Sequence, residues 1–202
     1  MEDLYKTLVK PTSEVLFKDK GSKFFGYAFP VENEEDIKYF LEEIKNKHSS
    51  ARHHCYAWQI GTEKDKIQYR ANDDGEPSNT AGMPIYGQLQ SFDITNALII
   101  VVRYFGGVKL GVGGLINAYK TTAQMCLEAV DIIEKTIDIH YKITFEYKHM
   151  NTVMRIIKEK NLNIESQTMN LSCEIVVSIR ESQAAQVPIS FEPFYEIKLT
   201  EL

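Results

Sequence analysis

The sequence contains no apolar run that approaches the ~18 residues of a membrane-spanning helix. Its first residues, Met1-Glu2-Asp3, are acidic and lack the apolar segment of a secretory signal. Cysteine is scarce, because only Cys55, Cys126 and Cys173 occur, an odd number at wide spacing. Such cysteines are typical of reduced, mostly buried thiols. We therefore expect a cytoplasmic protein with no membrane partner.

An excess of positive charge is also absent. The formal net charge is −5, and the isoelectric point is about 5.6. Domains that bind nucleic acids generally have an isoelectric point above ~9, so a non-specific nucleic-acid binder is disfavoured, although a local basic patch is not. The apolar content of 44% and the charged content of 25% are those of a globular protein. A chain of 202 residues suffices for one large or two small domains.

Periodicity and turn residues predict the elements of the first two thirds of the chain. Four strands are expected over residues 14–18, 22–29, 53–60 and 97–102, the last buried on both faces because it is continuously apolar. Three helices are expected over residues 34–47, 83–91 and about 114–130. Asn33 and Thr80 are the expected caps of the first two, and Met83 is expected to point inward. Residues 62–66 read as a polar turn and 71–82 as a loop.

The last third has a different pattern. Strands are expected over residues 140–147, 164–169, 171–180 and 194–199, with helices over 151–160 and 182–187. This β-α-β-β-α-β order is that of a ferredoxin-like unit. The sequence therefore predicts an α+β protein of two domains, residues 1–135 and 136–202.

A glycine-rich segment follows the most apolar strand. Five of the eleven glycines are Gly106, Gly107, Gly111, Gly113 and Gly114, and the segment also holds Arg103 and Lys109 but no acid. Amides free of side chains, followed by a helix N-terminus, favour an anion such as phosphate. The alternative is a tight strand-to-helix crossover. The segment has neither the Gly-Lys-Ser/Thr ending of a Walker loop nor the G-x-G-x-x-G spacing of a dinucleotide site.

An acidic loop comes earlier and contains Asp73, Asp74, Glu76, Ser78 and Thr80. Three carboxylates in four positions are able to bind a divalent cation or to act as acid and base. The favoured alternative is a turn that caps the following helix and pairs with Arg103 or Lys109.

Arg52, His53, His54 and Cys55 form a third group. Zinc ligation and a cysteine nucleophile are both conceivable. However, no second cluster completes four ligands, and neighbouring strand residues point to opposite faces. We therefore favour one histidine facing the cleft and one facing the core, with no metal. Tyr104 and Phe105 are among the aromatic residues able to stack on bases, although most of that group should fill the core.

Three ordered motifs resemble the signature of the IMPACT/YigZ family. They are Ala51-Arg52-His53-His54-Cys55-Tyr56-Ala57; Asp73-Asp74-Gly75-Glu76-Pro77-Ser78 with Thr80-Ala81-Gly82-Met83-Pro84; and Arg103-Tyr104-Phe105-Gly106-Gly107-Val108-Lys109-Leu110-Gly111 with Gly113-Gly114-Leu115 and Ala118-Tyr119. The chain departs from the usual pattern at Asn79, where the family has glycine, and at Asn117, where it often has arginine. The second departure removes one cation from the expected anion site.

The resemblance implies an N-terminal domain of the ribosomal protein S5 domain 2-like fold. It also implies a ferredoxin-like C-terminal domain similar to the last domain of elongation factor G. Relatives of both occur in proteins that contact RNA or the ribosome, and eukaryotic family members are linked to translational control through the Gcn1–Gcn2 stress pathway. Their Gcn1-binding module is a separate N-terminal domain, for which this sequence has no room, so we expect no Gcn1 binding.

We therefore expect a translation-associated regulatory protein that binds RNA, the ribosome or another phosphate-bearing partner. The alternatives are an Mg²⁺-dependent enzyme acting on a small phosphorylated metabolite or nucleotide, and a purely protein-binding regulator. A binding role without a cofactor, and a monomer, are favoured. The candidate anion- or nucleic-acid-binding residues are Arg52, His53, Arg103, Gly106, Gly107, Lys109, Gly111, Gly113 and Gly114, with Asp73, Asp74, Glu76, Ser78 and Thr80 as the rim of the cleft.

Overall fold

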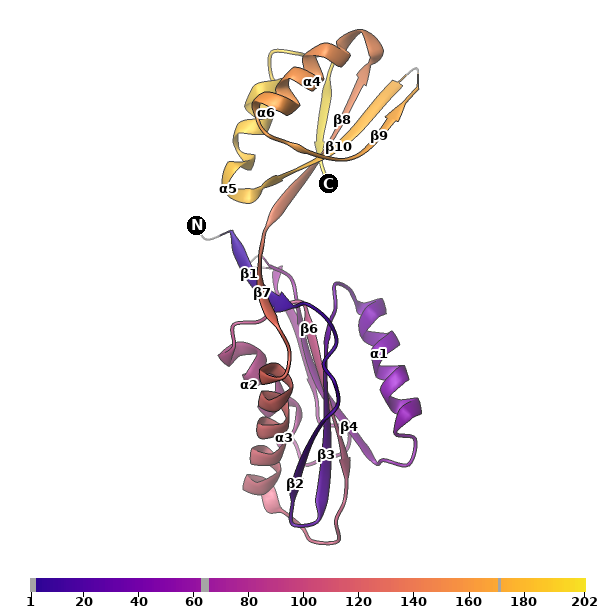
Figure 1. The fold of residues 1–202 in the computed structure, drawn as a ribbon, viewed down its shortest axis with the longest axis vertical. Helices are drawn as coiled ribbons and strands as arrows, with labels where there is room; N and C mark the ends of the chain where they lie inside the picture. Colours follow the sequence, from indigo (N-terminus) through magenta and orange to yellow (C-terminus); the bar gives the residue numbers. More distant parts are fainter. Residues whose placement is uncertain (1–2, 63–65, 171) are drawn as a thin grey trace. The chain divides into compact units, whose positions relative to one another are not determined.

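The computed structural model describes residues 3–62, 66–170 and 172–202, which form two compact units. The larger unit is Tyr5–Lys135. The smaller unit is Thr136–Leu202 together with the beginning of the chain, including Asp3 and Leu4. Each unit has its own sheet and helices, so the chain is a mixed α/β protein with several sheets (Figure 1).

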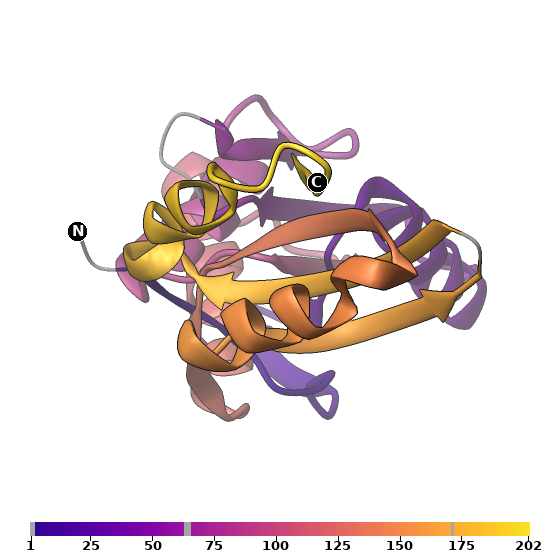
Figure 2. The same cartoon turned by 90° about the horizontal axis from the view of Figure 1, so that it is seen from above.

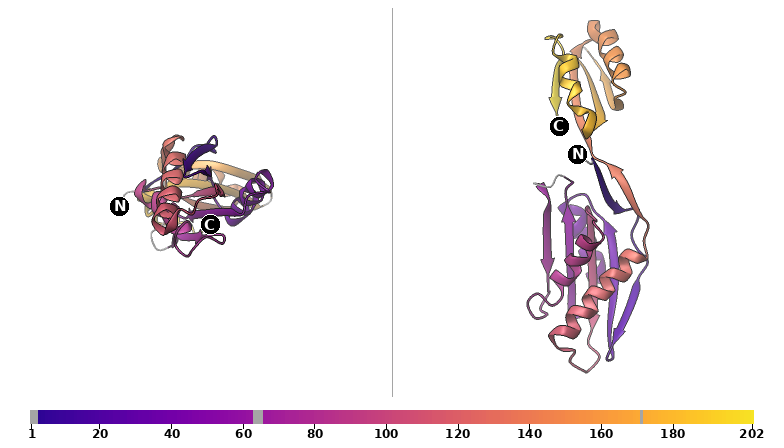
Figure 3. Two further views of the ribbon diagram at one scale, coloured as in Figure 1. Left: turned by 90° about the horizontal axis from the view of Figure 1, so that it is seen from below. Right: turned by 90° about the vertical axis from the view of Figure 1, so that its left-hand side faces the viewer.

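The larger unit is built on a five-stranded antiparallel sheet of order β2-β3-β6-β4-β5. Its strands are β2 (Val15–Asp19), β3 (Ser22–Pro30), β4 (His53–Ile60), β5 (Gln68–Asn72) and β6 (Ala97–Tyr104). The helices α2 (Gly82–Ser91) and α3 (Gly111–Glu128) cover one face, and α1 (Glu34–Lys47) covers the other (Figures 1 and 3). Two further strands, β1 (Leu4–Leu8) and β7 (Ile132–Thr136), pair in a small separate sheet.

The central strand β6 is buried on both faces, as its apolar sequence predicts. Ala97, Ile99 and Val101 pack in the core beneath α2 and α3. Leu98, Ile100 and Val102 pack in a second core beneath α1. Because side chains alternate along a strand, this one segment supplies both cores of the unit.

The smaller unit has a four-stranded antiparallel sheet of order β11-β8-β10-β9. Its elements are β8 (Asp138–Glu146), the 3-10 turn η2 (Tyr147–His149), α4 (Met150–Glu159), β9 (Asn163–Met169), β10 (Ser172–Arg180), α5 (Glu181–Ala184), α6 (Gln186–Phe191) and β11 (Lys198–Glu201). The helices lie over one face of this sheet (Figure 2), where Val153, Val187 and Phe191 pack on Ile143 and Ile175. The β-α-β-β-α-β order is the one that the sequence predicts.

Asp3, the third residue of the sequence, is anchored in the smaller unit. Its carboxylate accepts hydrogen bonds from Arg180 Nε at 2.7 Å and from the Ser182 amide at 3.2 Å. Hydrogen bonds from Ser182 and Arg180 hold the pKa of this carboxyl well below its usual range. The beginning of the chain is therefore tied to the C-terminal unit by specific contacts.

Several predicted boundaries are confirmed and others are wrong. Helix α1 spans the predicted residues, and Asn33 caps it by accepting from the Glu35 and Asp36 amides at 2.9 Å. Helix α3 begins at Gly111, three residues earlier than predicted, because its open first turn tolerates glycines of low helix propensity. Met83 is 43% exposed instead of inward, and β11 is shorter and later than predicted. The predicted turn at 62–66 falls partly outside the described residues.

Gly26 of β3 lets α3 approach the sheet closely, because a Cβ there would lie 2.5 Å from Cys126 Sγ and 2.8 Å from Thr122 Cγ2. We expect Gly26→Ala to lower the free energy of unfolding by about 1–3 kcal/mol through overpacking. Gly87 lies in α2, where an added methyl group would meet nothing within 4 Å. Gly87→Ala should therefore raise the free energy of unfolding by about 0.5–1 kcal/mol. Urea unfolding of both variants tests this, and equal effects would contradict the close approach of α3.

Candidate functional site

The strand register brings the candidate residues to one end of the five-stranded sheet. Lys23 of β3 pairs with Tyr104 of β6, and His53 of β4 pairs with Arg103 of β6. The hairpin between β2 and β3, the start of β4 and the segment between β6 and α3 therefore share this end. We call it the loop end of the sheet.

The glycines between β6 and α3 serve different purposes. The Gly106 amide donates to Ser22 Oγ at 3.1 Å, and a Cβ at Gly106 would clash with the backbone of Gly21 in the hairpin. Gly107 and Gly111 have φ angles of +89° and +73°, a region that favours glycine. These three glycines are thus required by the local chain path, which supports the crossover interpretation for them.

Gly113 and Gly114 lie within the first turn of α3 rather than in a loop. A Cβ at Gly114 would lie 3.0 Å from Leu110 Cβ, whereas a Cβ at Gly113 would meet nothing within 4 Å. Leu110 is the N-cap, no side chain caps the helix, and the first turn contains no acid. Gly113 is exposed. The orphan amides of this turn are therefore accessible, and no internal contact explains glycine at position 113.

Arg103 pairs with the acidic loop, as the interpretation favoured for that loop expects, and is therefore not a free cation for an anion site. It is only 7% exposed, and its Nη1 donates to Glu76 Oε1 at 2.7 Å. The Glu76 side chain is 4% exposed and also accepts from the Tyr119 hydroxyl at 2.8 Å. Arg103 Nε has no hydrogen-bond partner within the described residues, and the rings of Phe24 and Phe105 each lie 5.6 Å from the guanidinium carbon. The charge of Arg103 is thus neutralised inside the unit.

The acidic loop is a capping structure, the alternative that the sequence favours. Asp73 Oδ1 accepts from the Ala81 and Gly82 amides at 2.9 and 2.8 Å, at the start of α2, and Oδ2 accepts from the Asn79 amide at 2.8 Å. Thr80 is not the cap, because its hydroxyl donates to the Pro77 carbonyl at 2.6 Å.

The other rim residues do not form a cation site. Asp74 Oδ2 accepts from the His54 amide at 2.6 Å, while Ser78 is exposed. Within the described ranges, no group of three or more histidine, cysteine, aspartate or glutamate residues is arranged to hold a metal ion. The carboxylates thus shape the loop.

The side chains of the His53–Cys55 segment also have a structural role. Cys55 is fully buried, and its Sγ lies 3.0 Å from the Asp73 carbonyl oxygen and 3.3 Å from the Tyr119 hydroxyl. Burial raises the pKa of the Cys55 thiol, which disfavours the thiolate that a nucleophile needs. His53 Nδ1 donates to the Asp74 carbonyl at 2.8 Å, and His54 is buried on the opposite face. One histidine thus lies beside the acidic loop and one in the core.

Two candidate cations remain available at the loop end. Arg52 and Lys109 are both exposed. Neither forms an ion pair with any residue that the structure describes. Their positive charge is therefore open to a ligand.

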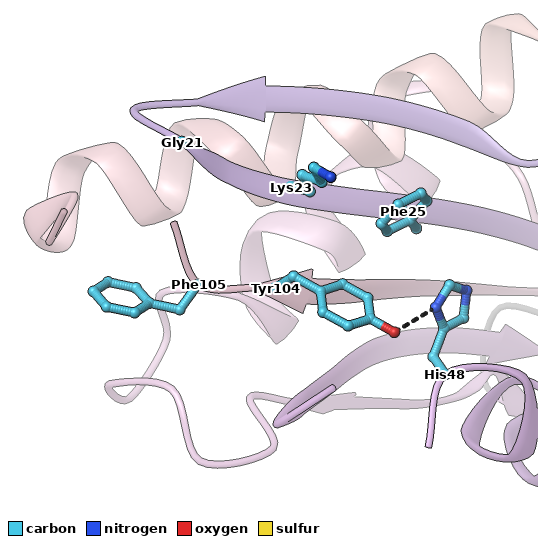
Figure 4. A pocket seen from close by; sticks show the side chains of 6 residues that line it. All are labelled: Gly21, Lys23, Phe25, His48, Tyr104 and Phe105. Carbon is cyan, nitrogen blue, oxygen red and sulfur yellow. Dashed lines mark hydrogen bonds between the residues drawn. The ribbon is translucent and has the colours of Figure 1, made fainter. Parts of the chain in front are cut away.

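A pocket of about 340 Å³ opens at the loop end on the α1 side of the sheet, and the sequence does not identify it as a site. Its lining residues are Gly21, Lys23, Phe25, His48, Tyr104 and Phe105 (Figure 4). Of these, the sequence indicates only Tyr104 and Phe105, as possible stacking residues. Lys23, Phe25 and His48 escape sequence reasoning, although the alternation of β3 from its hairpin turn places Lys23 and Phe25 on one face.

Residues 20–127 match the family model described as the Impact N-terminal domain. A Haemophilus influenzae protein named IMPACT family member is 34% identical over 173 residues, which cover 85% of this chain and 84% of the relative. The IMPACT family member YvyE of Bacillus subtilis is 33% identical over 178 residues, 87% of this chain and 81% of the relative. Protein IMPACT of Danio rerio is 34% identical over 96 residues, 46% of this chain and 30% of the relative.

A solved structure described as a hypothetical protein resembles the whole chain. It has a TM-score of 0.75 and 27% identity, with coverage of 100% of this chain and 98% of that one. The chain therefore shares its fold with a solved protein.

Arg103→Ala should lower the free energy of unfolding by about 3–5 kcal/mol, because it leaves the buried Glu76 carboxylate without its partner. Arg52→Ala removes an exposed arginine with no ion pair among the described residues. This change should alter the free energy of unfolding by less than about 0.5 kcal/mol. Urea titrations of the two variants provide the comparison. A small effect of Arg103→Ala would show that the pair does not hold the loop.

The larger unit should lose stability as the pH falls below about 6.5, the ordinary histidine pKa. Burial lowers the pKa of His48 and of His54, so the unfolded chain binds protons before the folded one does. Their contribution is fully present above that pH and declines below it. We expect the double variant His48→Gln/His54→Gln to show a flatter dependence of the urea midpoint on pH. A slope identical to that of the unchanged protein would contradict this assignment.

Proposed function

Because this chain belongs to the IMPACT family, we propose that it is a translation-associated regulatory protein of the cytoplasm that binds RNA or the ribosome. In this proposal, the phosphate groups of the RNA contact the chain at the loop end of the sheet. The link to translation follows from the family, whose eukaryotic members act in translational control. Those members match this chain over less than half of its length, so their protein partners are not transferred.

Gly113 is the observation that carries the proposed phosphate contact. Glycine within a helix is less favourable than alanine by about 1 kcal/mol, and no neighbour within 4 Å requires it here. A glycine at an exposed first turn lets an external anion reach the orphan amides of Gly111, Val112 and Gly113. The absence of acids in this turn and the nearby chain position of Lys109 favour the same kind of ligand.

The net charge of −5 makes the proposed contact local and sensitive to salt. Phosphate groups are repelled by the molecule as a whole and attracted at the loop end, where Arg52 and Lys109 lack internal partners among the described residues. Each phosphate that a cation neutralises releases counterions, so affinity falls as salt rises.

The proposed folds agree with such a role. We assign the larger unit to the ribosomal protein S5 domain 2-like fold and the smaller to the ferredoxin-like fold, both represented in proteins that contact RNA. The strand order β11-β8-β10-β9 with helices on one face supports the second assignment. The open face of that sheet offers a second contact surface.

The alternative of an Mg²⁺-dependent enzyme has less support. Asp73 is engaged by three amides and Glu76 by Arg103 and Tyr119, so neither is free to ligate a cation without dismantling the loop. A purely protein-binding regulator is the other alternative, and RNA titration distinguishes it.

We expect Gly113→Ala to leave the free energy of unfolding unchanged or higher by up to ~1 kcal/mol while it weakens RNA binding. The added methyl shields the amides without disturbing a neighbour. Lys109→Ala should weaken binding at low salt and reduce its salt dependence by about one phosphate contact. Fluorescence anisotropy with single-stranded RNA at several salt concentrations measures both.

Two matched controls accompany this experiment. Gly87→Ala is the same change in another helix with equal open space, and Lys120→Ala removes an exposed lysine further along α3. Neither should alter RNA affinity. Absence of RNA binding at every salt concentration would overturn the proposed function, and equal losses in test and control variants would remove the loop end as its site.

A further inference from the structure

We propose that the pocket lined by Lys23, Phe25, His48, Tyr104 and Phe105 binds an unpaired RNA base, which stacks on the rings of Phe25 and Tyr104 while Lys23 contacts a neighbouring phosphate. This inference rests on the proposed function and adds a subsite to it. It assigns to the loop end a preference for single-stranded over double-stranded RNA, because a paired base has no free face to offer.

The pocket exists because α1 is shorter than the sheet that it covers. The helix ends at Lys47, with His48 as its C-cap, whereas β3 and β6 continue to Ser22 and Tyr104 at the loop end. The α1 face of the last strand pairs is therefore left without a covering helix. Phe25 is only half-buried there, whereas Tyr27 and Phe29, further along the same face, are buried.

The uncovered surface is aromatic. The rings of Phe25 and Tyr104 meet edge to face with centroids 5.7 Å apart, and Phe25 lies 5.2 Å from the His48 ring. Phe105 is 55% exposed and also lines the pocket, but its ring points away from Tyr104 (Figure 4) and lies 5.6 Å from the guanidinium carbon of Arg103. Aromatic side chains beside a positively charged group are the arrangement on which single-stranded nucleic acids stack their bases.

A hydrogen-bond chain holds Tyr104 in place. The Tyr27 hydroxyl donates to Glu14 Oε2, so its oxygen accepts from His48 Nε2 at 2.6 Å. Burial lowers the pKa of His48, so the neutral ring keeps its proton on Nε2, and Nδ1 accepts from the Tyr104 hydroxyl at 3.1 Å. The Tyr104 ring is thus fixed before a ligand arrives, which reduces the entropy lost on binding.

The charges favour a nucleotide over an apolar protein side chain. Lys23 is exposed and forms no ion pair with the described part of the chain, and no carboxylate lines the pocket. The proposed phosphate site on α3 lies on the other face of the sheet, so Lys23 is the cation beside this pocket. Aromatic rings next to a lysine match a base with an adjacent phosphate.

The test uses the full chain and labelled RNA about 10 nucleotides long, within the range that one single-strand module covers. The four ligands are the single strand, the same backbone with abasic residues, the duplex, and free AMP. The variants are Tyr104→Ala, Tyr104→Phe, which keeps the ring, and Tyr195→Ala, which removes a 93% exposed aromatic residue elsewhere. Thermal unfolding verifies that each variant is folded.

We expect the single strand to bind about tenfold more tightly than the abasic backbone. Tyr104→Ala should reduce this ratio to about one, whereas Tyr104→Phe and Tyr195→Ala should preserve it. Lys109→Ala should weaken the binding of both the single strand and the abasic backbone and leave the ratio of their affinities unchanged. This result distinguishes the base subsite from the phosphate site. The duplex should bind no better than the abasic strand.

Four results would overturn the inference. A ratio of one in the unchanged protein, or a ratio that survives Tyr104→Ala, would remove the base subsite while leaving the phosphate contact intact. Binding of AMP without binding of RNA would assign the pocket to a free nucleotide instead. Absence of binding to every RNA would overturn this inference together with the proposed function.

Discussion

The buried ion pair between Arg103 and Glu76 is the interaction on which the loop end depends. It joins the last residues of β6 to the acidic loop, and the Tyr119 hydroxyl extends the connection to α3. Two charges held out of water stabilise the fold only while both are present. The pair therefore fixes three segments relative to one another, and Asp73 completes the arrangement by capping α2.

This pair also determines what the loop end offers to a ligand. The carboxylates and Arg103 are used internally, so the accessible positive character comes from the α3 amides and from Lys109, Arg52 and Lys23. The glycines divide in the same way. Gly106, Gly107 and Gly111 satisfy the chain path, whereas Gly113 leaves space that the protein itself does not use. A site made of amides and separated cations suits a diffuse anion such as a nucleic-acid backbone.

The end of β6 acts on both faces of the sheet because side chains alternate along a strand. Arg103 points toward α3 and stabilises the fold, while Tyr104 points toward the face that α1 leaves open. Structural and candidate binding roles thus fall on consecutive residues. Because α1 is short, Phe25 and Tyr104 line a pocket. A longer helix would cover them as it covers Tyr27 and Phe29.

The sequence alone determined the family, the strand β6, helix α1 and the order of elements in the smaller unit, because these depend on local periodicity, caps and ordered motifs. It also favoured the capping role of the acidic loop. The sequence left open whether Arg103 or Lys109 pairs with this loop. Only the tertiary structure showed that the pair is Arg103 with Glu76, that Thr80 does not cap α2, and that Lys23, Phe25 and His48 line one pocket. The physical reason is that these contacts join residues distant in sequence, whose meeting depends on strand register and on where a helix stops.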